Sequence, residues 1–304
     1  MHLLRPRAAS RNMPNAGRTR ASIEVQMTSK PTSLAIIGGG PGGLFTAYRL
    51  QQRCALPFTT TIYEASPRVG GKILTAEFSA VPARYEAGAA ELYDYSHVGD
   101  DPLRRLVAEL RLDTRPMEGS AVIMDDRVIG GLDDACHHVG EPAWRVLRQF
   151  DTAAKAWMTP REFYDADWAD RAQDPKTTES FHALLERVPN DLARRYLQCL
   201  VHSDLATEPH QTNASYGLQN YLMNDPGYLR LYTIDGGIER LPRTIASRLS
   251  ANIRVNEPVI AVGPGENGAL RVESRRHGDV VSEQYDYVVA ALPNDWLPAI
   301  EWRG

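Results

Sequence analysis

The chain has few cysteines and no long apolar run. Three of its 304 residues are cysteine (Cys54, Cys136 and Cys199), and no two of them form a C-x-x-C pair. An odd number of widely spaced cysteines argues against a disulfide framework and favours a reducing compartment, so we expect a cytoplasmic protein. No apolar stretch approaches the ~20 residues that a membrane-spanning helix needs, so we expect no transmembrane segment.

The chain also lacks an excess of positive charge and a metal-binding pattern. Lysine and arginine together number 34 against 38 aspartate and glutamate residues, which gives a formal net charge of −4. This balance gives no reason to expect nucleic acid or an anionic surface as a partner. His137 and His138 are adjacent, so they point apart in a helix or a strand, and no second pair lies four residues away. We therefore expect no metal site.

Residues 1 to 32 differ in composition from the rest. They contain six basic residues, one acidic residue (Glu24) and few apolar ones. Such a leader can be a transit peptide, but a disordered tail, or an early start codon with Met27 as the true initiator, is the simpler interpretation. No apolar stretch of ~7–15 residues marks a secretory signal. We expect residues 1–32 to be a disordered or leader segment.

The most informative stretch is a glycine-rich turn between an expected strand and an expected helix. Leu34 to Ile37 is an apolar, partly β-branched run, which predicts a buried parallel strand. Gly38, Gly40 and Gly43 follow at G-x-G-x-x-G spacing. Apolar residues then recur at helical spacing from Leu44, so we expect a helix to begin at the last glycine.

A second expected strand supplies the acidic residue that a dinucleotide fold requires. Thr60 to Tyr63 ends in Glu64, which lies 21 residues after Gly43. A lone G-x-G-x-x-G is weak evidence, but a strand before it, a helix after it and an acid about 20 residues on together predict dinucleotide binding. The helix N-terminus then faces a pyrophosphate, and Glu64 accepts hydrogen bonds from the ribose hydroxyls. A glycine-rich turn without a ligand is the simpler alternative.

The segment from Arg68 to Lys72 follows directly. Gly70 and Gly71 lie between two cations, which suits a loop that passes close to a pyrophosphate and neutralises it.

These motifs resemble the flavin-dependent amine oxidase superfamily, which includes monoamine, polyamine and L-amino-acid oxidases, protoporphyrinogen oxidase and phytoene desaturases. The chain has the G-x-G-x-x-G-L fingerprint and E-A-x-x-R-x-G-G, with Lys72 where arginine is usual. Lysine keeps the charge but loses the bidentate fork. Tyr85 to Leu92 resembles the next motif, whose Gly-Ala backbone passes near the flavin, and Tyr232 to Pro242 and Tyr287 to Pro293 resemble later ones. The resemblance covers about residues 33–304 and the N-terminal two-thirds or so of the family.

The resemblance implies an α/β fold, with a Rossmann-like FAD-binding domain of the glutathione-reductase/amine oxidase type and a mostly helical α+β substrate domain inserted in it. The expected boundaries are 33–98 and 232–304 for the discontinuous FAD-binding domain and 99–231 for an incomplete substrate or cap domain. Periodicity predicts helices over 101–112, 143–157, 178–188 and 238–249, a hairpin over 121–129 and a strand over 253–262.

FAD is the cofactor that the resemblance implies. The residues that match FAD-contacting positions are Gly38, Gly40, Pro41, Gly42, Gly43, Leu44, Glu64, Ala65, Arg68, Gly71, Lys72, Gly88, Ala89, Ala90, Glu91 and Val259. Val259 is expected to contact the adenine through its backbone. Glu91 stands where the L-amino-acid oxidase branch has an arginine for the substrate carboxylate, so it either meets a cationic amine or faces solvent.

No catalytic residue can be nominated. Family members have a further glycine-rich FAD segment near the C-terminus, and many have a lysine at flavin N5, but the last of the four lysines here is Lys176. We therefore expect a fragment of a longer enzyme; a C-terminal half that is a separate chain and a truncated, inactive product are the alternatives. Several aromatic residues of the insert could line a substrate pocket, although core packing is the simpler interpretation. They are Trp157, Phe163, Tyr164, Trp168, Tyr216, Tyr221, Tyr228 and Tyr232.

A second match to the glycine pattern, Gly263 to Gly268, is expected to be a turn. The residues that follow it, Ala269 to Ser274, alternate like a strand and offer no helix N-terminus to a phosphate. Flavoenzymes reduced by NAD(P)H commonly carry a second nucleotide fingerprint, so an electron source in the substrate itself fits better.

The leading hypothesis is thus an FAD-dependent oxidoreductase that oxidises a small-molecule amine by hydride transfer to flavin, with dioxygen or another electron acceptor. One alternative is a desaturase or a protoporphyrinogen-oxidase-like enzyme acting on C–C bonds of an apolar ring or polyene. Alternatives from other classes are a non-catalytic dinucleotide-binding fragment and an NAD(P)-dependent dehydrogenase, which the segment from Arg68 to Lys72 disfavours.

Overall fold

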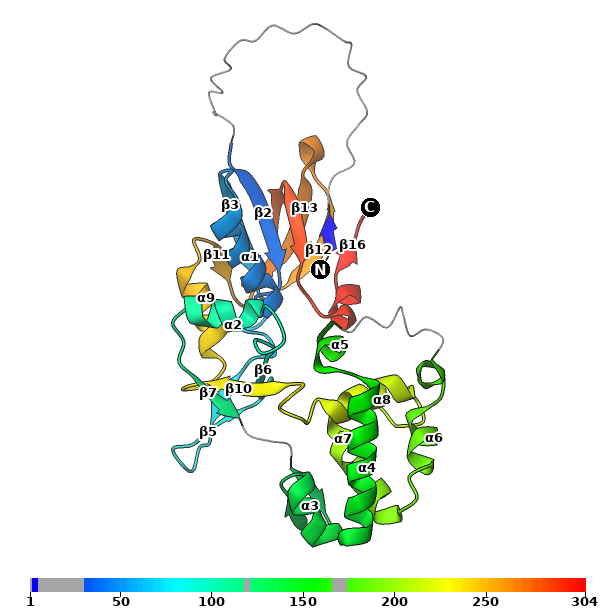
Figure 1. Ribbon diagram of the computed structural model, residues 1–304. Coiled ribbons are helices and arrows are strands. Elements are labelled where there is room, and N and C mark those ends of the chain that lie inside the picture. Colours follow the sequence, from blue (N-terminus) through cyan, green and yellow to red (C-terminus); the bar gives the residue numbers. More distant parts are fainter. Residues whose placement is uncertain (1, 5–29, 118–120, 166–173) are drawn as a thin grey trace, which may run out of the picture. The chain divides into compact units, whose positions relative to one another are not determined.

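The computed structural model describes residues 2–4, 30–117, 121–165 and 174–304 (Figure 1). The chain forms two compact units: unit 1 contains residues 1–90 and 236–304, and unit 2 contains residues 91–235. None of the described helices is both long enough and apolar enough to cross a membrane.

The divisions between the units differ from those expected at 98/99 and 231/232. Two short strands explain the difference, namely β6 (Leu92–Asp94) and β10 (Arg230–Ile234). They pair antiparallel with each other, so both belong to unit 2.

Unit 1 is built on a five-stranded sheet with the strand order β1-β15-β2-β3-β11. The strands are β1 (His2–Leu4), β2 (Thr32–Ile37), β3 (Phe58–Tyr63), β11 (Asn252–Arg254) and β15 (Tyr287–Ala290). β2, β3, β11 and β15 run parallel, and β1 pairs antiparallel with β15. Residues 2–4 and Thr32, where β2 begins, are thus in strands rather than disordered, and the leader interpretation stays a prediction; residues 1 and 5–29 lie outside the described chain.

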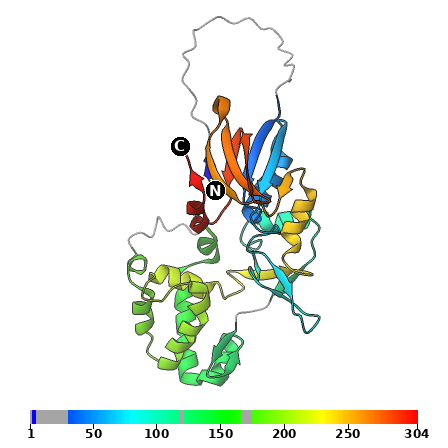
Figure 2. The same ribbon diagram turned by 180° about the vertical axis from the view of Figure 1, so that it is seen from behind.

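The five-stranded sheet is covered on both faces (Figures 1 and 2). Helix α1 (Pro41–Arg53) connects β2 to β3, and the side chain of Ile36 in β2 lies against Gly43 of this helix. Ala35 and Ile37 point the other way, because successive side chains of a strand alternate, and belong to the core shared with a second sheet. That sheet has the order β14-β13-β12-β16, with β12 (Val259–Pro264), β13 (Leu270–Arg276), β14 (Asp279–Tyr285) and β16 (Glu301–Trp302).

The predicted single strand over 253–262 is wrong. The structure has two strands there, β11 in the five-stranded sheet and β12 in the second sheet. Asn256 adopts a φ of 53°, in the left-handed region that ends a strand, and Pro258 has no N–H to donate to a ladder. The chain therefore turns between residues 254 and 259 and changes sheets.

A hairpin of β4 (Thr75–Glu77) and β5 (Arg84–Glu86) supports the turn before α9 (Arg240–Arg248). The Thr75 hydroxyl accepts a hydrogen bond from the Glu239 N–H at 3.1 Å, and Glu86 accepts one from the Ile238 N–H at 2.9 Å. Gly237 has a φ of +106°, and a Cβ there would lie 2.4 Å from Thr75. The turn therefore requires glycine. The helix predicted over 238–249 is confirmed over the shorter span of α9, which packs against α1.

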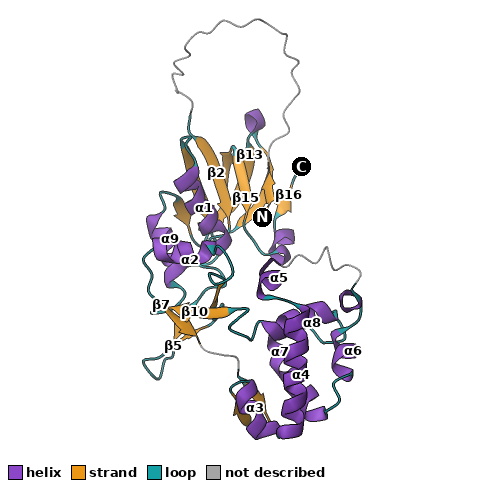
Figure 3. Cartoon of the chain, in the orientation of Figure 1, coloured by secondary structure: helices purple, strands orange, loops and turns teal. Residues whose placement is uncertain are grey.

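Unit 2 is mostly helical (Figure 3). Its helices are α2 (Pro102–Glu109), α3 (Leu132–Val139), α4 (Glu141–Trp157), α5 (Pro160–Asp165), α6 (Phe181–Glu186), α7 (Asp191–Leu205) and α8 (Ala214–Leu222). α4, α7 and α8 pack side by side, with α6 against α8 and α3 against α4. Three predicted helices are confirmed as α2, α4 and α6, within a few residues of the expected ends.

The strands of unit 2 are short. β7 (Thr114–Met117) completes a three-stranded sheet of order β6-β10-β7. The predicted hairpin is confirmed as β8 (Val122–Met124) and β9 (Arg127–Ile129). Asp125 and Asp126 between them have φ values of 53° and 61°, as in the two-residue turn that matches strand twist.

Candidate cofactor site

The turn between β2 and α1 is closed by contacts that only glycine allows. Gly38 has a φ of +109°, and a Cβ on it would lie 2.6 Å from the carbonyl oxygen of Ala291. A Cβ on Gly43 would lie 2.0 Å from the carbonyl oxygen of Gly38. Two glycines of the fingerprint are therefore required for the packing of the helix on the strand, before any ligand is considered.

Helix α1 presents its N-terminus at the end of β2. It begins at Pro41, two residues before the predicted Gly43, because proline suits a first-turn position whose N–H would have no helical partner. Gly40 caps the helix without a side-chain hydrogen bond, and the first turn contains no acidic residue. The free N–H groups of the first turn and the positive end of the helix dipole are thus available to an anion.

The Glu64 carboxylate is held next to this turn. One oxygen, Oε2, accepts the Gly39 N–H and the other, Oε1, accepts the Ser66 N–H, each at 2.8 Å. An ionised carboxylate can accept about four hydrogen bonds, so both oxygens retain capacity for hydroxyl donors. Gly39 and Ser66 were not predicted as site residues. The run of three glycines at Gly38 to Gly40 was the one signal for the first of them.

The loop from Arg68 to Lys72 packs directly on the β2–α1 turn. The Gly70 N–H donates to the Gly39 carbonyl at 2.9 Å. Gly71 has a φ of +53°, and a Cβ on it would lie 3.1 Å from the Gly40 Cα. The two glycine motifs, 30 residues apart, therefore meet backbone to backbone.

Arg68 does not project freely from this loop. Its guanidinium donates to the carbonyls of Gly71 at 2.7 Å, Ile73 at 2.9 Å and Val69 at 3.2 Å. The side chain thus holds its own loop closed while contributing a positive charge. Lys72 is exposed.

The segment around Gly88 runs beside the same loop. The Ala89 N–H donates to the Lys72 carbonyl at 3.0 Å, and a Cβ on Gly88 would lie 1.9 Å from that oxygen. Ala90 is the last residue of unit 1 before the division and is exposed. Glu91 is the first residue of unit 2 and is half-buried.

The remaining predicted residues lie close to these. Leu44 is fully buried in α1, Gly42 is exposed in its first turn, and Ala65 is exposed beside Glu64. Val259 is the first residue of β12 and is buried.

The turn before Val259 is bonded to the Glu64 backbone. The Glu64 N–H donates to the Arg254 carbonyl at 2.8 Å, and the Glu257 N–H donates to the Glu64 carbonyl at 2.9 Å. Val259, the expected adenine contact, lies two residues after Glu257. The fold thus brings it close to Glu64, the expected ribose acid.

Four charged side chains in and beside this turn form a closed ring of ion pairs. We call this ring the charge square; its members are Arg254, Glu257, Arg276 and Glu283. Arg254 lies 2.8 Å from Glu283 and 3.6 Å from Glu257, and Arg276 lies 2.9 Å from Glu257 and 3.2 Å from Glu283. The Glu257 side chain is only 5% exposed. Burial raises the pKa of Glu283, but hydrogen bonds from Arg254, Tyr285 and Arg276 outweigh it and lower the pKa to about 2.

This low pKa predicts an acid-sensitive contribution of Glu283 to stability. A carboxyl whose folded pKa is below its unfolded value stabilises the fold fully above the unfolded value, 4.5 here, and loses that contribution as the pH falls towards about 2. In thermal unfolding, Glu283→Gln is expected to melt below the parent protein near neutral pH, with the gap narrowing below about pH 4.5. A gap that is constant with pH would contradict the assignment.

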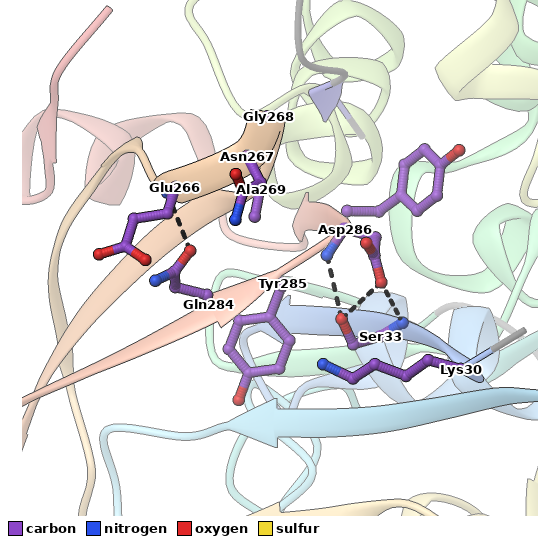
Figure 4. A pocket seen from close by; sticks show the side chains of 10 residues that line it. Lys30, Ser33, Glu266, Asn267, Gly268, Ala269, Gln284, Tyr285 and Asp286 are labelled. Carbon is purple, nitrogen blue, oxygen red and sulfur yellow. Dashed lines mark hydrogen bonds between the residues drawn. The ribbon is translucent and has the colours of Figure 1, made fainter.

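A hollow of about 670 Å³ lies at the opposite end of the five-stranded sheet, where β2 begins (Figure 4). Asp286 there accepts hydrogen bonds from the Ser33 N–H and hydroxyl, both at 2.7 Å. The Glu266 N–H donates to Gln284 at 2.9 Å. Ser33 and Asp286 thus satisfy each other, and so do the Glu266 N–H and the Gln284 side chain.

The second glycine match forms one wall of this hollow. Between the end of β12 at Pro264 and the start of β13 at Leu270 there is only a 3₁₀ turn over Glu266–Gly268. The prediction of a turn between strands is confirmed.

The aromatic residues suggested as pocket lining are mostly core. Phe163, Tyr221, Tyr228 and Tyr232 are buried, and Tyr216 is exposed. Tyr164 is half-buried, and Trp168 lies outside the described residues. Trp157 lines a cavity of about 290 Å³ within unit 2, together with Phe150 and Leu184. Among the described residues, no group of three or more histidine, cysteine, aspartate and glutamate side chains could hold a metal ion.

Taken together, the site offers N–H donors at a helix end, backbone surfaces free of side chains at Gly40 and Gly71, and a fixed carboxylate. This donor set fits the diphosphate and the adenosine ribose of a dinucleotide, the half of FAD that a fold of this kind grips.

The fold of this chain is similar to that of known proteins. Four solved structures of putrescine oxidase and its variants match 90% of this chain and 61% of their own, with TM-scores of 0.62 to 0.63 and 21–23% identity. One of them is the wild type bound to putrescine. Polyamine oxidase 1 of Oryza sativa subsp. japonica is 31% identical over 135 residues, which cover 38% of this chain and 26% of that protein.

The chain therefore spans less than two thirds of the length of the relatives it matches. The family of flavin containing amine oxidoreductases matches residues 41–303, nearly the whole described chain after the first strands. This chain belongs to the flavin containing amine oxidoreductase family.

Proposed function

We propose that unit 1 binds FAD and that the protein is an FAD-dependent oxidoreductase that oxidises an amine, with dioxygen as the electron acceptor. The observation that carries the proposal is the contact of the two glycine motifs beside the Glu64 carboxylate. FAD, when bound, supplies the redox chemistry, since hydride transfer from a C–N bond belongs to the cofactor.

The residues of this chain would bind and orient the cofactor. The N-terminus of α1 would face the pyrophosphate, with the charges of Arg68 and Lys72 nearby. Glu64 would accept the ribose hydroxyls, and the backbone at Val259 would meet the adenine. We further propose that unit 2 is the substrate or cap domain.

An amine is the favoured substrate class. The relatives named above are a polyamine oxidase and a putrescine oxidase, one of them bound to putrescine. Glu91 carries a carboxylate where a carboxylate-binding arginine would be needed for an amino acid, which supports a cationic amine instead.

The test is FAD binding followed by amine-driven turnover. The purified protein is expected to take up FAD and to release hydrogen peroxide with a diamine such as putrescine, but not with an apolar polyene. Protein that gains no flavin absorbance after addition of FAD would refute the cofactor assignment. Flavin uptake without peroxide from any member of an amine panel would refute amine oxidation by this chain and leave the desaturase-like enzyme and the non-catalytic dinucleotide-binding protein as the alternatives.

A further inference from the structure

The charge square defined above is a closed ring in which Glu257 is 5% exposed, while Arg276 and Glu283 are about one-third exposed. Three of its residues belong to strands, Arg254 to β11, Arg276 to β13 and Glu283 to β14, and Glu257 lies in the loop after β11. Each cation contacts both anions, so the removal of one member leaves its two partners sharing a single counter-ion. These ion pairs connect the 254–257 turn to β13 and β14 of the second sheet.

The same turn is bonded to the backbone of Glu64 on both sides. The Glu64 N–H donates to the carbonyl of Arg254, and the Glu64 carbonyl accepts the N–H of Glu257. These two residues are also members of the square. A shift of either side chain is thus transmitted to the backbone of Glu64 through a single hydrogen bond.

Tyr63, the last residue of β3, contacts the charge square and directly precedes Glu64. Its hydroxyl accepts a hydrogen bond from Arg254 at 3.2 Å and lies 2.8 Å from the hydroxyl of Tyr285. Tyr285 in turn donates to Glu283 at 2.8 Å. Burial, together with the contact to Tyr285, raises the pKa of Tyr63, so its hydroxyl stays neutral and keeps its proton. Because Tyr63 directly precedes Glu64, the residue is anchored on both sides.

We propose that the charge square is a positioning device for the Glu64 carboxylate and that it thereby sets the affinity for the adenosine half of the cofactor. None of its members has to touch the ligand. They act through Tyr63 and the 254–257 turn, which hold Glu64 so that its carboxylate bonds the N–H groups of Gly39 and Ser66. The part of this inference that concerns affinity rests on the proposed binding of FAD.

The test compares Glu283→Gln with Glu273→Gln. Glu273 is a matched control, because its side chain is 18% exposed and lies 2.7 Å from Arg303 and 3.4 Å from Arg271. It belongs to β13, as does Arg276, but these ion pairs do not include the square or Tyr63. Both substitutions remove a paired carboxylate, so both are expected to lower the melting temperature without FAD.

Two measurements separate positioning from a general loss of stability. Amide hydrogen exchange without FAD is expected to become faster at Gly39 and Ser66 in Glu283→Gln and to stay unchanged in Glu273→Gln. The Kd for FAD is expected to rise about tenfold in the first variant, as for substitutions behind the direct ligands of a bound ion, and less than about twofold in the second.

Equal exchange at Gly39 and Ser66 in the two variants would overturn the positioning role, whether or not the protein binds FAD. Faster exchange with an unchanged Kd would remove the link to affinity. If the parent protein does not bind FAD, the proposed function fails, and the exchange measurement still decides whether the square positions Glu64.

Discussion

Gly43→Ala is expected to destabilise unit 1 by about 3 kcal/mol, at the upper end of the range for overpacking. The new Cβ would lie 2.0 Å from the carbonyl oxygen of Gly38 and 3.1 Å from Ile36. The oxygen belongs to the backbone at the tightest part of the turn, so neither it nor the helix can move without disturbing β2. Since small domains are stable by only about 5–15 kcal/mol, chemical denaturation without FAD will detect the loss.

Gly42→Ala is the control. Gly42 directly precedes Gly43 in the same helical turn. A Cβ on Gly42 would meet only the Cβ of Ala291 at 3.8 Å, which is an ordinary contact. Alanine has the higher helix propensity by up to about 1 kcal/mol, so this variant is expected to be as stable as the parent or slightly more so. Equal destabilisation of the two variants would mean that the helix does not pack on the strand as described.

Glu64→Ala is expected to lower FAD affinity about 100-fold and to cost some stability as well. Two hydrogen bonds from hydroxyls to a carboxylate together contribute about 3 kcal/mol, which corresponds to that factor. The stability falls because the N–H groups of Gly39 and Ser66 would lose their acceptor. One such unsatisfied donor costs about 1–3 kcal/mol where it is buried, as Gly39 is.

Glu64→Gln separates the two effects. Glutamine keeps the length of the side chain and one acceptor oxygen, so more of the stability should be retained while the affinity still falls. Glu77→Ala, which removes the same charge from the exposed β4–β5 hairpin, serves as the control for electrostatics at a distance. The Kd for FAD from fluorescence titration is the measurement, and an unchanged Kd in both Glu64 variants would refute the ribose assignment.

The local structure around the candidate site was predicted well, whereas the roles of its residues stay predictions. The strand over residues 34–37, the glycine turn, the helix and Glu64 follow from spacing within about 30 residues. Their order in a parallel sheet is confirmed. The start of α1 was misplaced by two residues, although Pro41 at the first turn carried the signal for the earlier position.

What the sequence could not reveal depends on contacts between distant residues. From the sequence, Arg68 was interpreted as a cation that neutralises a pyrophosphate. Only the folded loop shows that its guanidinium donates hydrogen bonds to backbone carbonyls of the same loop. The pairing of β6 with β10 sets the division between the units, and no local pattern reports it. The members of the charge square are 3 to 29 residues apart with no shared periodicity. The break in the 253–262 segment was readable from Asn256 and Pro258 but was missed.

The pairing of β1 with β15 also affects the tendency of the protein to associate with other chains. A strand edge with unpaired N–H and C=O groups is a template for association with other chains. Residues 2–4 cover the edge of β15, which is otherwise a short run of apolar residues, Tyr287 to Ala290. Without residues 2–4 this apolar edge would be open, so a variant that lacks them is expected to associate more readily with other chains.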